Sequence, residues 1–367
     1  MSSGDLITIS QIENPQVLEP KSINTLALGL NYLMSSETTT RAPEIISTRT
    51  SPIVIVCVGM AGSGKTTFIH RLYLYFQSIG KRVYSMNLDP AVKNVPYPTN
   101  IDIRDTVDYK KVMKEFVLGP NGAMITSLNL FATKFDQVVD VLEKRAEEYD
   151  YIIVDTPGQI EVFNWSASGQ IILDSLAVSF PIVTTYVVDT VRCRNPTTFM
   201  SNMTYACSIM YKTKLPFVLV FNKTDVHPAD FAKEWMTEFD VFLEALKPAE
   251  SGYMASLSRA LCLSMEEFYR QLRTAGVSAL TGGGMDELQS QIDDAVREYH
   301  EAYVPYLAHQ REQMARRKDE LAARQLTELK SGGAEKAMQR INYNDEEDDD
   351  EEDEMAELEK LRSMLKK

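Results

Sequence analysis

A glycine-rich segment near residue 60 constrains the fold of this 367-residue chain more than any other feature. Residues 59–66 read GMAGSGKT and match the pattern G-x-x-x-x-G-K-[ST]. An apolar run at residues 53–58 precedes the motif, and an amphipathic segment at residues 68–76 follows it. Strand, glycine-rich loop and helix in this order are typical of a phosphate-binding P-loop. The sequence therefore predicts a P-loop NTPase fold.

The residue types in this motif suit a polyphosphate. Glycines allow backbone N–H groups to curve around an anion, and Lys65 would neutralise the terminal phosphates. The hydroxyl of Thr66 is a predicted ligand of Mg²⁺, an ion that prefers oxygen donors. The predicted phosphate-binding residues are Gly59, Gly62, Ser63, Gly64, Lys65, Thr66 and Thr67.

A second motif predicts which base is bound. The apolar run at residues 217–221 ends in Asn222-Lys223-Thr224-Asp225, and N-K-x-D at a strand end is how P-loop GTPases read guanine. Because a carboxylate only accepts hydrogen bonds, Asp225 would accept from N1–H and the exocyclic amine of guanine. A weaker segment, Ser278-Ala279-Leu280, would bring the Ala279 backbone N–H to guanine O6. We predict that GTP and GDP bind through Asn222, Lys223, Asp225 and Ala279.

A third motif, DTPG at residues 155–158, follows the apolar run at residues 151–154. At this position P-loop GTPases hold Mg²⁺ through an aspartate, usually by way of water, and sense the γ-phosphate through a glycine N–H. Asp155 is therefore the second predicted metal residue, beside Thr66, and Gly158 is the predicted phosphate sensor.

Three polar side chains near these motifs are candidates for activating the attacking water. Gln159 directly follows the DTPG motif and Glu161 lies two residues further on. Asp89 ends the apolar run at residues 83–88 and could polarise the water or support the metal. The alternatives are a simple Asp-Pro turn at Asp89 and ordinary polar loop residues at Gln159 and Glu161.

The apolar runs predict an α/β fold with a doubly wound, mostly parallel sheet. Runs that are apolar on both faces and separated by helical patterns are typical of buried parallel strands, which bind ligands at their carboxyl ends. The expected strands are residues 53–58, 83–88, 151–154, 182–188 and 217–221, with a weaker one at 277–280. Helical insertions are expected between them, including one long helix at residues 123–148 and another at residues 255–274.

Composition predicts three regions. Residues 1–50 are rich in Ser, Thr, Pro and Asn and are expected to be a disordered extension, residues 51–305 form the nucleotide-binding domain, and residues 306–367 form a charged tail. The tail combines a charged helical segment at 309–330, an acidic run at 345–354 and a leucine pattern at 355–365. The acidic run is either solvated or a docking segment for a basic partner, and the leucine pattern is a candidate nuclear export signal.

Charge and cysteine usage argue against several kinds of partner. The net charge is −14, but without the acidic run 42 acidic side chains face 38 basic ones. We therefore expect no direct nucleic-acid binding, which needs a clustered basic excess. No apolar stretch approaches the ~20 residues of a membrane span, so no membrane partner is expected. The four cysteines lack C-x-x-C spacing, which suits a reducing compartment such as the cytoplasm.

One further motif, Gly119-Pro120-Asn121, lies between two predicted helices and would by itself indicate only a turn. In order with the P-loop, NLDPA, DTPGQIE and NKTD motifs, however, it makes the chain resemble the GPN-loop GTPases over residues 53–303. The details of these motifs and the acidic tail look most like the eukaryotic paralogue implicated in RNA polymerase II assembly and nuclear import.

The resemblance implies a Mg²⁺-dependent GTPase domain at residues 51–305 that hydrolyses GTP to GDP. It also implies a homodimer or a heterodimer with another GPN-loop GTPase, in which the loop of Gly119, Pro120 and Asn121 enters the partner's active site. The catalytic positions it implies are Asp89, Asp155, Gln159, Glu161 and Asn121. RNA polymerase II subunits would be partners, and the chain would shuttle between cytoplasm and nucleus. A P-loop kinase and a non-hydrolysing GTP-binding adaptor are the alternatives.

Overall fold

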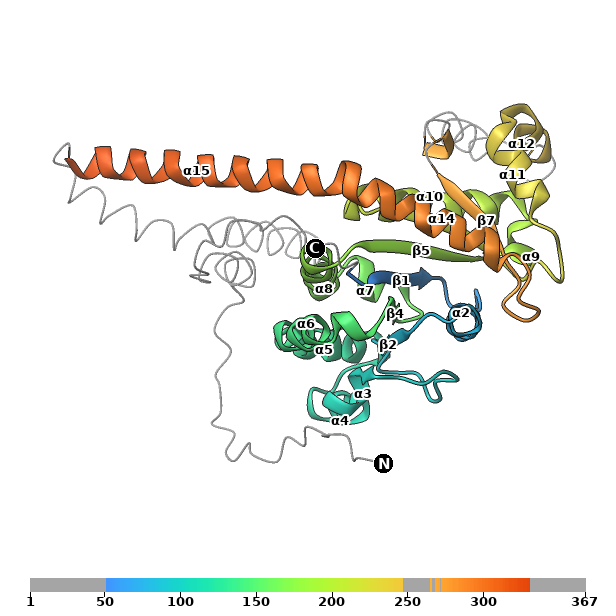
Figure 1. Cartoon of the computed structure of the whole chain (residues 1–367), viewed down its shortest axis with the longest axis horizontal. Helices are drawn as coiled ribbons and strands as arrows, with labels where there is room; N and C mark the ends of the chain where they lie inside the picture. Colours follow the sequence, from blue (N-terminus) through green and yellow to red (C-terminus); the bar gives the residue numbers. More distant parts are fainter. Residues whose placement is uncertain (1–50, 247–264, 266–267, 271, 331–367) are drawn as a thin grey trace, which may run out of the picture. The chain divides into compact units, whose positions relative to one another are not determined.

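The computed structural model describes residues 51–246, 265, 268–270 and 272–330, to which every structural statement below refers. Within these residues the strands form one seven-stranded sheet in the order β3-β2-β4-β1-β5-β6-β7, and all neighbouring strands run parallel (Figure 1). The strands are β1 Ile53–Gly59, β2 Val83–Asn87, β3 Ile101–Asp102, β4 Tyr151–Asp155, β5 Ile182–Asp189, β6 Phe217–Asn222 and β7 Arg273–Gly276. The predicted doubly wound parallel sheet is confirmed.

Helices cover both faces of the sheet. Their bounds are α2 Lys65–Ser78, α3 Ile103–Thr106, α4 Tyr109–Glu115, α5 Pro120–Ala132, α6 Phe135–Lys144, the short η1 Ala146–Glu148, α7 Ile160–Asn164, α8 Ala167–Ser179, α9 Thr190–Cys193, α10 Pro196–Thr213, α11 Asp230–Thr237, α12 Phe239–Leu246, α14 Met285–Glu298, the π-helical turn η2 Tyr299–Tyr303 and α15 Val304–Lys330. Helices α2 and α14 pack on one face, where Phe68, Phe76, Leu288 and Ile292 are buried. Helices α5, α7, α8 and α10 enclose a larger apolar cluster on the other face.

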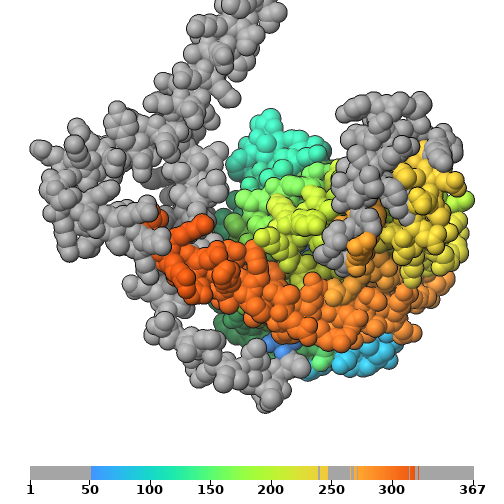
Figure 2. Space-filling view, turned by 90° about the horizontal axis from the view of Figure 1, so that it is seen from above, coloured from blue at the N-terminus to red at the C-terminus, as the bar shows by residue number. Residues whose placement is uncertain are grey.

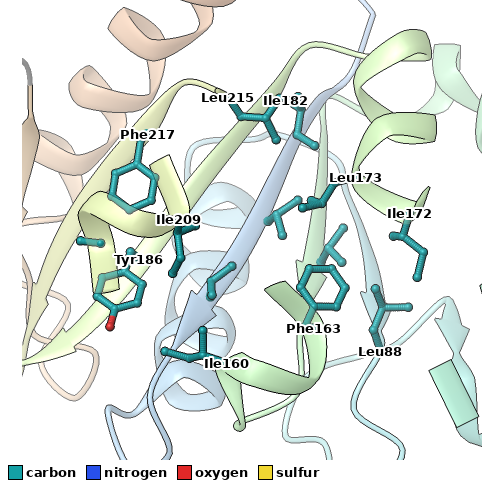
Figure 3. Close-up of a cluster of buried hydrophobic side chains, with 14 of the residues drawn as sticks. Leu88, Ile160, Phe163, Ile172, Leu173, Ile182, Tyr186, Ile209, Leu215 and Phe217 are labelled. Atoms are coloured by element: carbon teal, nitrogen blue, oxygen red, sulfur yellow. The ribbon is translucent and has the colours of Figure 1, made fainter. Parts of the chain in front are cut away.

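The central strands are continuous apolar runs because they are buried on both faces. In β1, β4, β5 and β6 nearly every side chain is buried, and alternate residues enter the two clusters. Figure 3 shows part of the larger cluster, in which Ile209 of α10 lies near Tyr186 of β5 and Phe163 of α7 lies near Leu88. These packed layers fix the carboxyl ends of the strands, after which the P-loop, DTPG and NKTD motifs lie.

Three of the sequence expectations about elements differ from the structure. The last strand is Arg273–Gly276, directly before the expected residues 277–280, which instead enter a loop. This strand lies at the sheet edge and buries only Ala275, so its apolar signal is weak. The expected helix at 255–274 falls mostly outside the described residues, and its end is occupied by this strand. The expected helix at 123–148 is divided into α5, α6 and η1 by a break at Thr133 and Lys134.

The GPN motif is also placed differently from the expected turn. Pro120 and Asn121 begin α5, and Gly119 is its N-cap, because proline is favoured in the first turn of a helix. The chain reverses before the motif, at Val117, whose backbone has φ 52° and whose side chain is 90% exposed. The Leu118 N–H donates to the Met113 carbonyl and closes the end of α4 in a Schellman-type arrangement.

The carboxyl-terminal helix α15 contains the expected charged segment and runs through the expected boundary between residues 305 and 306 without a break. Tyr306 and Leu307 pack against the larger core, whereas every side chain described from Arg311 onward is exposed. Figure 2 shows α14 and α15 in orange and red as one continuous ridge on the face in view. None of the helices in the described part of the chain is long and apolar enough to cross a membrane. The expectations for residues 1–50 and 331–367 lie outside the described residues.

Candidate active site

The P-loop connects β1 to α2 and closes around a space at the sheet's carboxyl edge. Gly62 and Gly64 have φ 83° and 86°, a left-handed conformation that glycine adopts without strain. A Cβ atom on Gly64 would lie 2.7 Å from Asn222 Nδ2, so no larger residue fits there. The Ser63 hydroxyl is buried and has no hydrogen-bond partner among the described residues, which leaves it available to a phosphate oxygen.

Lys65 and Thr66 begin α2 and turn toward Asp155 at the end of β4. The Lys65 ammonium donates to the Thr156 carbonyl and lies 3.6 Å from Asp155 Oδ1. The Thr66 hydroxyl donates to Asp155 Oδ2 at 3.4 Å. Burial raises the pKa of the Asp155 carboxyl above its ordinary value, although Lys65 and the hydroxyl of Tyr97 act in the opposite direction. Thr67 is exposed on the first turn of α2.

The predicted metal residues fit Mg²⁺. Thr66 and Asp155 supply a hydroxyl and a carboxylate within 3.4 Å of each other. Asp155 is 3% exposed, and its Oδ1 atom accepts no hydrogen bond among the described residues. Mg²⁺ prefers such oxygen ligands and is usually bound by one or two protein groups together with phosphates and water. These two residues would hold the ion, while the polyphosphate would supply further ligands.

The three candidates for activating water follow the neighbouring strands β2 and β4. Asp89 follows β2, which pairs with β4 so that Asn87 is opposite Asp155. Its Oδ1 atom accepts a hydrogen bond from the Ala91 N–H at 2.9 Å, so Asp89 does organise a turn, as the alternative interpretation held. Gln159 precedes α7 and is partly buried, and Glu161 is exposed in the first turn of that helix. Among these three side chains, Gln159 and Asp89 are the more sheltered.

Gly158 brings the DTPG loop against the P-loop, because a Cβ atom added to it would lie 3.9 Å from the Ala61 Cα and Cβ atoms. Asn121 lies in the first turn of α5 and is exposed. Helix α5, which begins with the GPN motif, packs against α4, α7 and α8. The motif is therefore linked through α5 to α7, the helix that follows Gln159.

The predicted base motif lies beside the P-loop. Asn222 Nδ2 donates to the Ser63 carbonyl at 3.0 Å, and Asn222 Oδ1 accepts from the Ala279 N–H at 3.1 Å. The Lys223 ammonium donates to the Gly62 carbonyl at 3.0 Å. The Ser278 hydroxyl donates to Asp225 Oδ1 at 2.6 Å and orients that carboxylate. Asn222 and Lys223 therefore contact the phosphate loop directly, and Ala279 is joined to it through Asn222.

Sequence reasoning missed three residues that hold this site together. Asp189 ends β5 and accepts from the Lys223 ammonium at 2.7 Å, and its position at a strand end was the signal that could have identified it. Arg71 of α2 donates to the carbonyls of Ala279, at 2.9 Å, and Leu280. Tyr97 donates to Asp155 Oδ2 at 2.9 Å, and no motif marks either Arg71 or Tyr97.

These contacts place a phosphate loop, an acidic metal-side residue and an N-K-x-D base motif in one site, which defines the class of P-loop nucleotide-binding proteins. Residues 57–298 match a family model described as "Conserved hypothetical ATP binding protein". The chain is 51% identical over 286 residues to a protein of Schizosaccharomyces pombe named GPN-loop GTPase 1, an alignment that covers 76% of this chain and 78% of that one. The chain belongs to the GPN-loop GTPase family.

Two further comparisons agree with this assignment. The GPN-loop GTPase 1 of Saccharomyces cerevisiae is 56% identical over 258 residues, which cover 68% of this chain and 67% of that protein. A crystal structure of a GTPase in its apo form from Pyrococcus abyssi has a TM-score of 0.59 and 26% identity, and covers 66% of this chain and 97% of its own. The likeness of sequence to the yeast protein and the likeness of fold to the archaeal one each cover about two thirds of this chain.

Proposed function

We propose that this chain hydrolyses GTP to GDP and phosphate with Mg²⁺ bound. The observation that carries the proposal is the hydrogen bond from the Lys223 ammonium to the Gly62 carbonyl, because it joins the base-reading motif to the phosphate loop. The relatives named above are called GTPases, which supports the same activity. The family model is described as ATP-binding, but Asp225, whose Oδ1 accepts from Ser278, is a hydrogen-bond acceptor of the kind that suits guanine.

The residues divide the work of phosphoryl transfer, in which catalysis consists mostly of positioning and electrostatic stabilisation. Lys65 and the P-loop N–H groups bind the polyphosphate, and Gly158 contacts the terminal phosphate through its N–H. Gln159 orients the attacking water, with Asp89 as the second candidate. When bound at Thr66 and Asp155, Mg²⁺ would neutralise charge that develops on the phosphate oxygens. Glu161 is more exposed than either of these candidates and is therefore the weakest of the three.

A turnover assay with the purified full-length chain tests the activity. With GTP and Mg²⁺ the protein should release free phosphate, and ATP should be a poor substrate at equal concentration. Transfer of labelled phosphate to an acceptor would instead indicate a kinase. Tight GTP binding with no phosphate release would indicate a non-hydrolysing adaptor.

We further propose that the working form is a dimer, either of two copies or with another GPN-loop GTPase, and that it assists assembly and nuclear import of RNA polymerase II. This second step rests on resemblance to the family, together with the exposed GPN motif at the start of α5. It implies a protein that moves between cytoplasm and nucleus. Depleting the chain should leave polymerase subunits in the cytoplasm, and unchanged nuclear polymerase would contradict the proposal. Mass spectrometry of co-purifying proteins would identify the dimer partner.

A further inference from the structure

The connection between β2 and β3 brings a buried tyrosine to the metal-side carboxylate. Tyr97 is 4% exposed, and its hydroxyl donates to Asp155 Oδ2 at 2.9 Å. The same oxygen accepts from Thr66 at 3.4 Å, whereas Oδ1 accepts no hydrogen bond among the described residues and lies 3.6 Å from the Lys65 ammonium. The two carboxylate oxygens of Asp155 therefore differ sharply: both hydroxyl donors share one of them.

We propose that Tyr97 is a positioning residue for Asp155: it holds Oδ2, the oxygen that also faces Thr66, and so keeps the carboxylate in one orientation at the Mg²⁺ site. The proposal rests on the proposed Mg²⁺-dependent GTP hydrolysis and deepens it by one residue. A carboxylate with no fixed partner can rotate, and each rotation would move the oxygen that faces the ion. A hydrogen bond from a rigid donor prevents this rotation, as outer-shell partners do at many metal sites.

Tyr97 is suited to this role because its ring cannot move freely. It belongs to the apolar cluster that also contains Cys57 and Phe68, so its hydroxyl is carried by a packed ring with few accessible rotamers. Tyrosine also adds no charge, unlike a lysine at the same place, so it orients Asp155 without competing with the cation. A phenol donates one hydrogen bond, and Asp155 receives it.

The backbone that carries Tyr97 is itself anchored. Asn100 Oδ1 accepts from the Ser85 N–H at 2.9 Å, which fixes the connection at its end. Near its start, Arg104 donates to the carbonyls of Val92 and Lys93 at 3.3 and 3.2 Å. The backbone is therefore fixed on both sides of Tyr97. The same connection also carries Asp89. Through Tyr97 and this connection, an ion bound at Asp155 would be coupled to the position of Asp89, one of the candidates for activating water.

The test compares Tyr97→Phe with Tyr151→Phe in the full-length chain. Tyr151 lies on the same strand as Asp155, and its hydroxyl accepts a hydrogen bond from Gln289 at 2.9 Å, so the control also removes one partnered phenol oxygen. GDP release is followed with a fluorescent GDP, first in EDTA and then across a Mg²⁺ titration. In EDTA both variants should resemble the wild type. The Mg²⁺ concentration needed for half-maximal retention should rise about tenfold for Tyr97→Phe only, a loss typical of outer-shell partners.

Each outcome is decisive for Tyr97. The proposal would be overturned if Tyr97→Phe needed the same Mg²⁺ concentration as the wild type, or a lower one, for half-maximal GDP retention. The hydroxyl would then be irrelevant to the ion or would compete with it. A loss of GDP binding in EDTA would overturn it as well, since it would show that Tyr97 shapes the nucleotide site itself. Circular dichroism first establishes that Tyr97→Phe is folded, because an unfolded variant would show the same loss. The double variant with Asp155→Asn then provides a second measurement. If Tyr97 acts through Asp155, the hydroxyl should make no difference to Mg²⁺ dependence in that background.

The same experiment separates this proposal from the proposed function. A wild-type chain that retains GDP equally with and without Mg²⁺ would contradict the Mg²⁺-dependent function. A wild type that responds to Mg²⁺, together with a Tyr97→Phe variant that responds identically, would contradict only the role of Tyr97.

Discussion

In the proposed function, the selection of guanine depends on one carboxylate. Asp225 accepts a hydrogen bond from Ser278 at 2.6 Å and keeps its remaining acceptor capacity for the base. Replacing it by Asn should weaken GDP binding and improve binding of xanthosine diphosphate, because one acceptor becomes a donor. Sites built around buried hydrogen bonds can discriminate by about 10⁴-fold when a partner is lost. Competition binding with the two nucleotides measures the change, and Asp230→Asn, an exposed acid on α11, is the control. An unchanged preference for GDP would contradict the assignment.

A different outcome is expected for Gln159, which directly follows Gly158, the residue that lies against the P-loop. Its position before α7 suits contact with the attacking water rather than with bound GDP. Gln159→Leu should therefore leave GDP affinity near the wild-type value and slow turnover by about 10²-fold, as for a lost transition-state group. Single-turnover phosphate release measures this rate. A variant as fast as the wild type would transfer the role to Asp89 or Glu161.

These residues could be proposed from sequence because their residue types match short motifs that follow apolar runs. Arg71 could not, because its contact with Ala279 joins residues 208 positions apart, and nothing local distinguishes it from another helical arginine. Tyr97 was equally hidden, since its partner lies 58 positions away. The missing information is tertiary: sequence patterns name the groups that meet the ligand, whereas the groups that hold them are set by packing.

The junction of α7 and α8 allows a sharp test of how the elements fit together. A Cβ atom on Gly169 would lie 1.9 Å from the Phe163 carbonyl oxygen, so the first turn of α8 can approach α7 only with glycine there. Gly169→Ala should destabilise the fold by about 2 kcal/mol or more, because backbone atoms would have to separate. Urea unfolding measures this loss. Gly122→Ala in α5 is the matched control, since its Cβ would lie 3.5 Å from Leu118, and equal losses would contradict the argument.

The elements themselves were predicted unevenly, and the reason is burial. The five strong apolar runs became β1, β2, β4, β5 and β6, which are covered on both faces. The edge strand β7 buries only Ala275 and was misplaced, and the two-residue β3 gave no signal. The division of residues 123–148 into separate helices escaped prediction because the break at Thr133 and Lys134 contains neither glycine nor proline. Both helices pack against α8, a tertiary contact that no local pattern signals.

For the molecule as a whole, α15 separates into a packed start and an exposed remainder. The Lys214 ammonium donates to the Tyr306 hydroxyl at 2.8 Å and lies 4.7 Å from the centroid of the Tyr306 ring. Truncation after residue 310 keeps this contact and should change GTP turnover and GDP affinity less than twofold. Truncation after Tyr303 removes Tyr306 and Leu307 from the core and should lower the melting temperature by several degrees, in line with a loss of about 1 kcal/mol. If the chain truncated after residue 310 no longer bound nucleotide, the exposed part of α15 would belong to the nucleotide-binding domain.

The final prediction concerns Asn121 and requires the proposed dimer. Asn121 is exposed at the start of α5, and the family resemblance implies that it acts on the partner's nucleotide. Asn121→Ala should therefore lower turnover while sparing GDP affinity, because GDP lacks the γ-phosphate near which the side chain would act. Phosphate release and GDP binding of the same preparation measure the two effects. A parallel loss of GDP affinity would contradict this assignment.

Mixed dimers then decide whether Asn121 acts across the interface. One chain carries both Lys65→Ala and Asn121→Ala, its partner is wild type, and two affinity tags isolate the mixed species. Only the wild-type P-loop can then bind nucleotide, and it receives the altered GPN loop from the partner. If the loop acts in trans, turnover at that site should fall toward the rate of the Asn121→Ala homodimer. If turnover per intact site equals that of the wild-type dimer, Asn121 acts within its own chain, because the wild-type chain still carries its own Asn121.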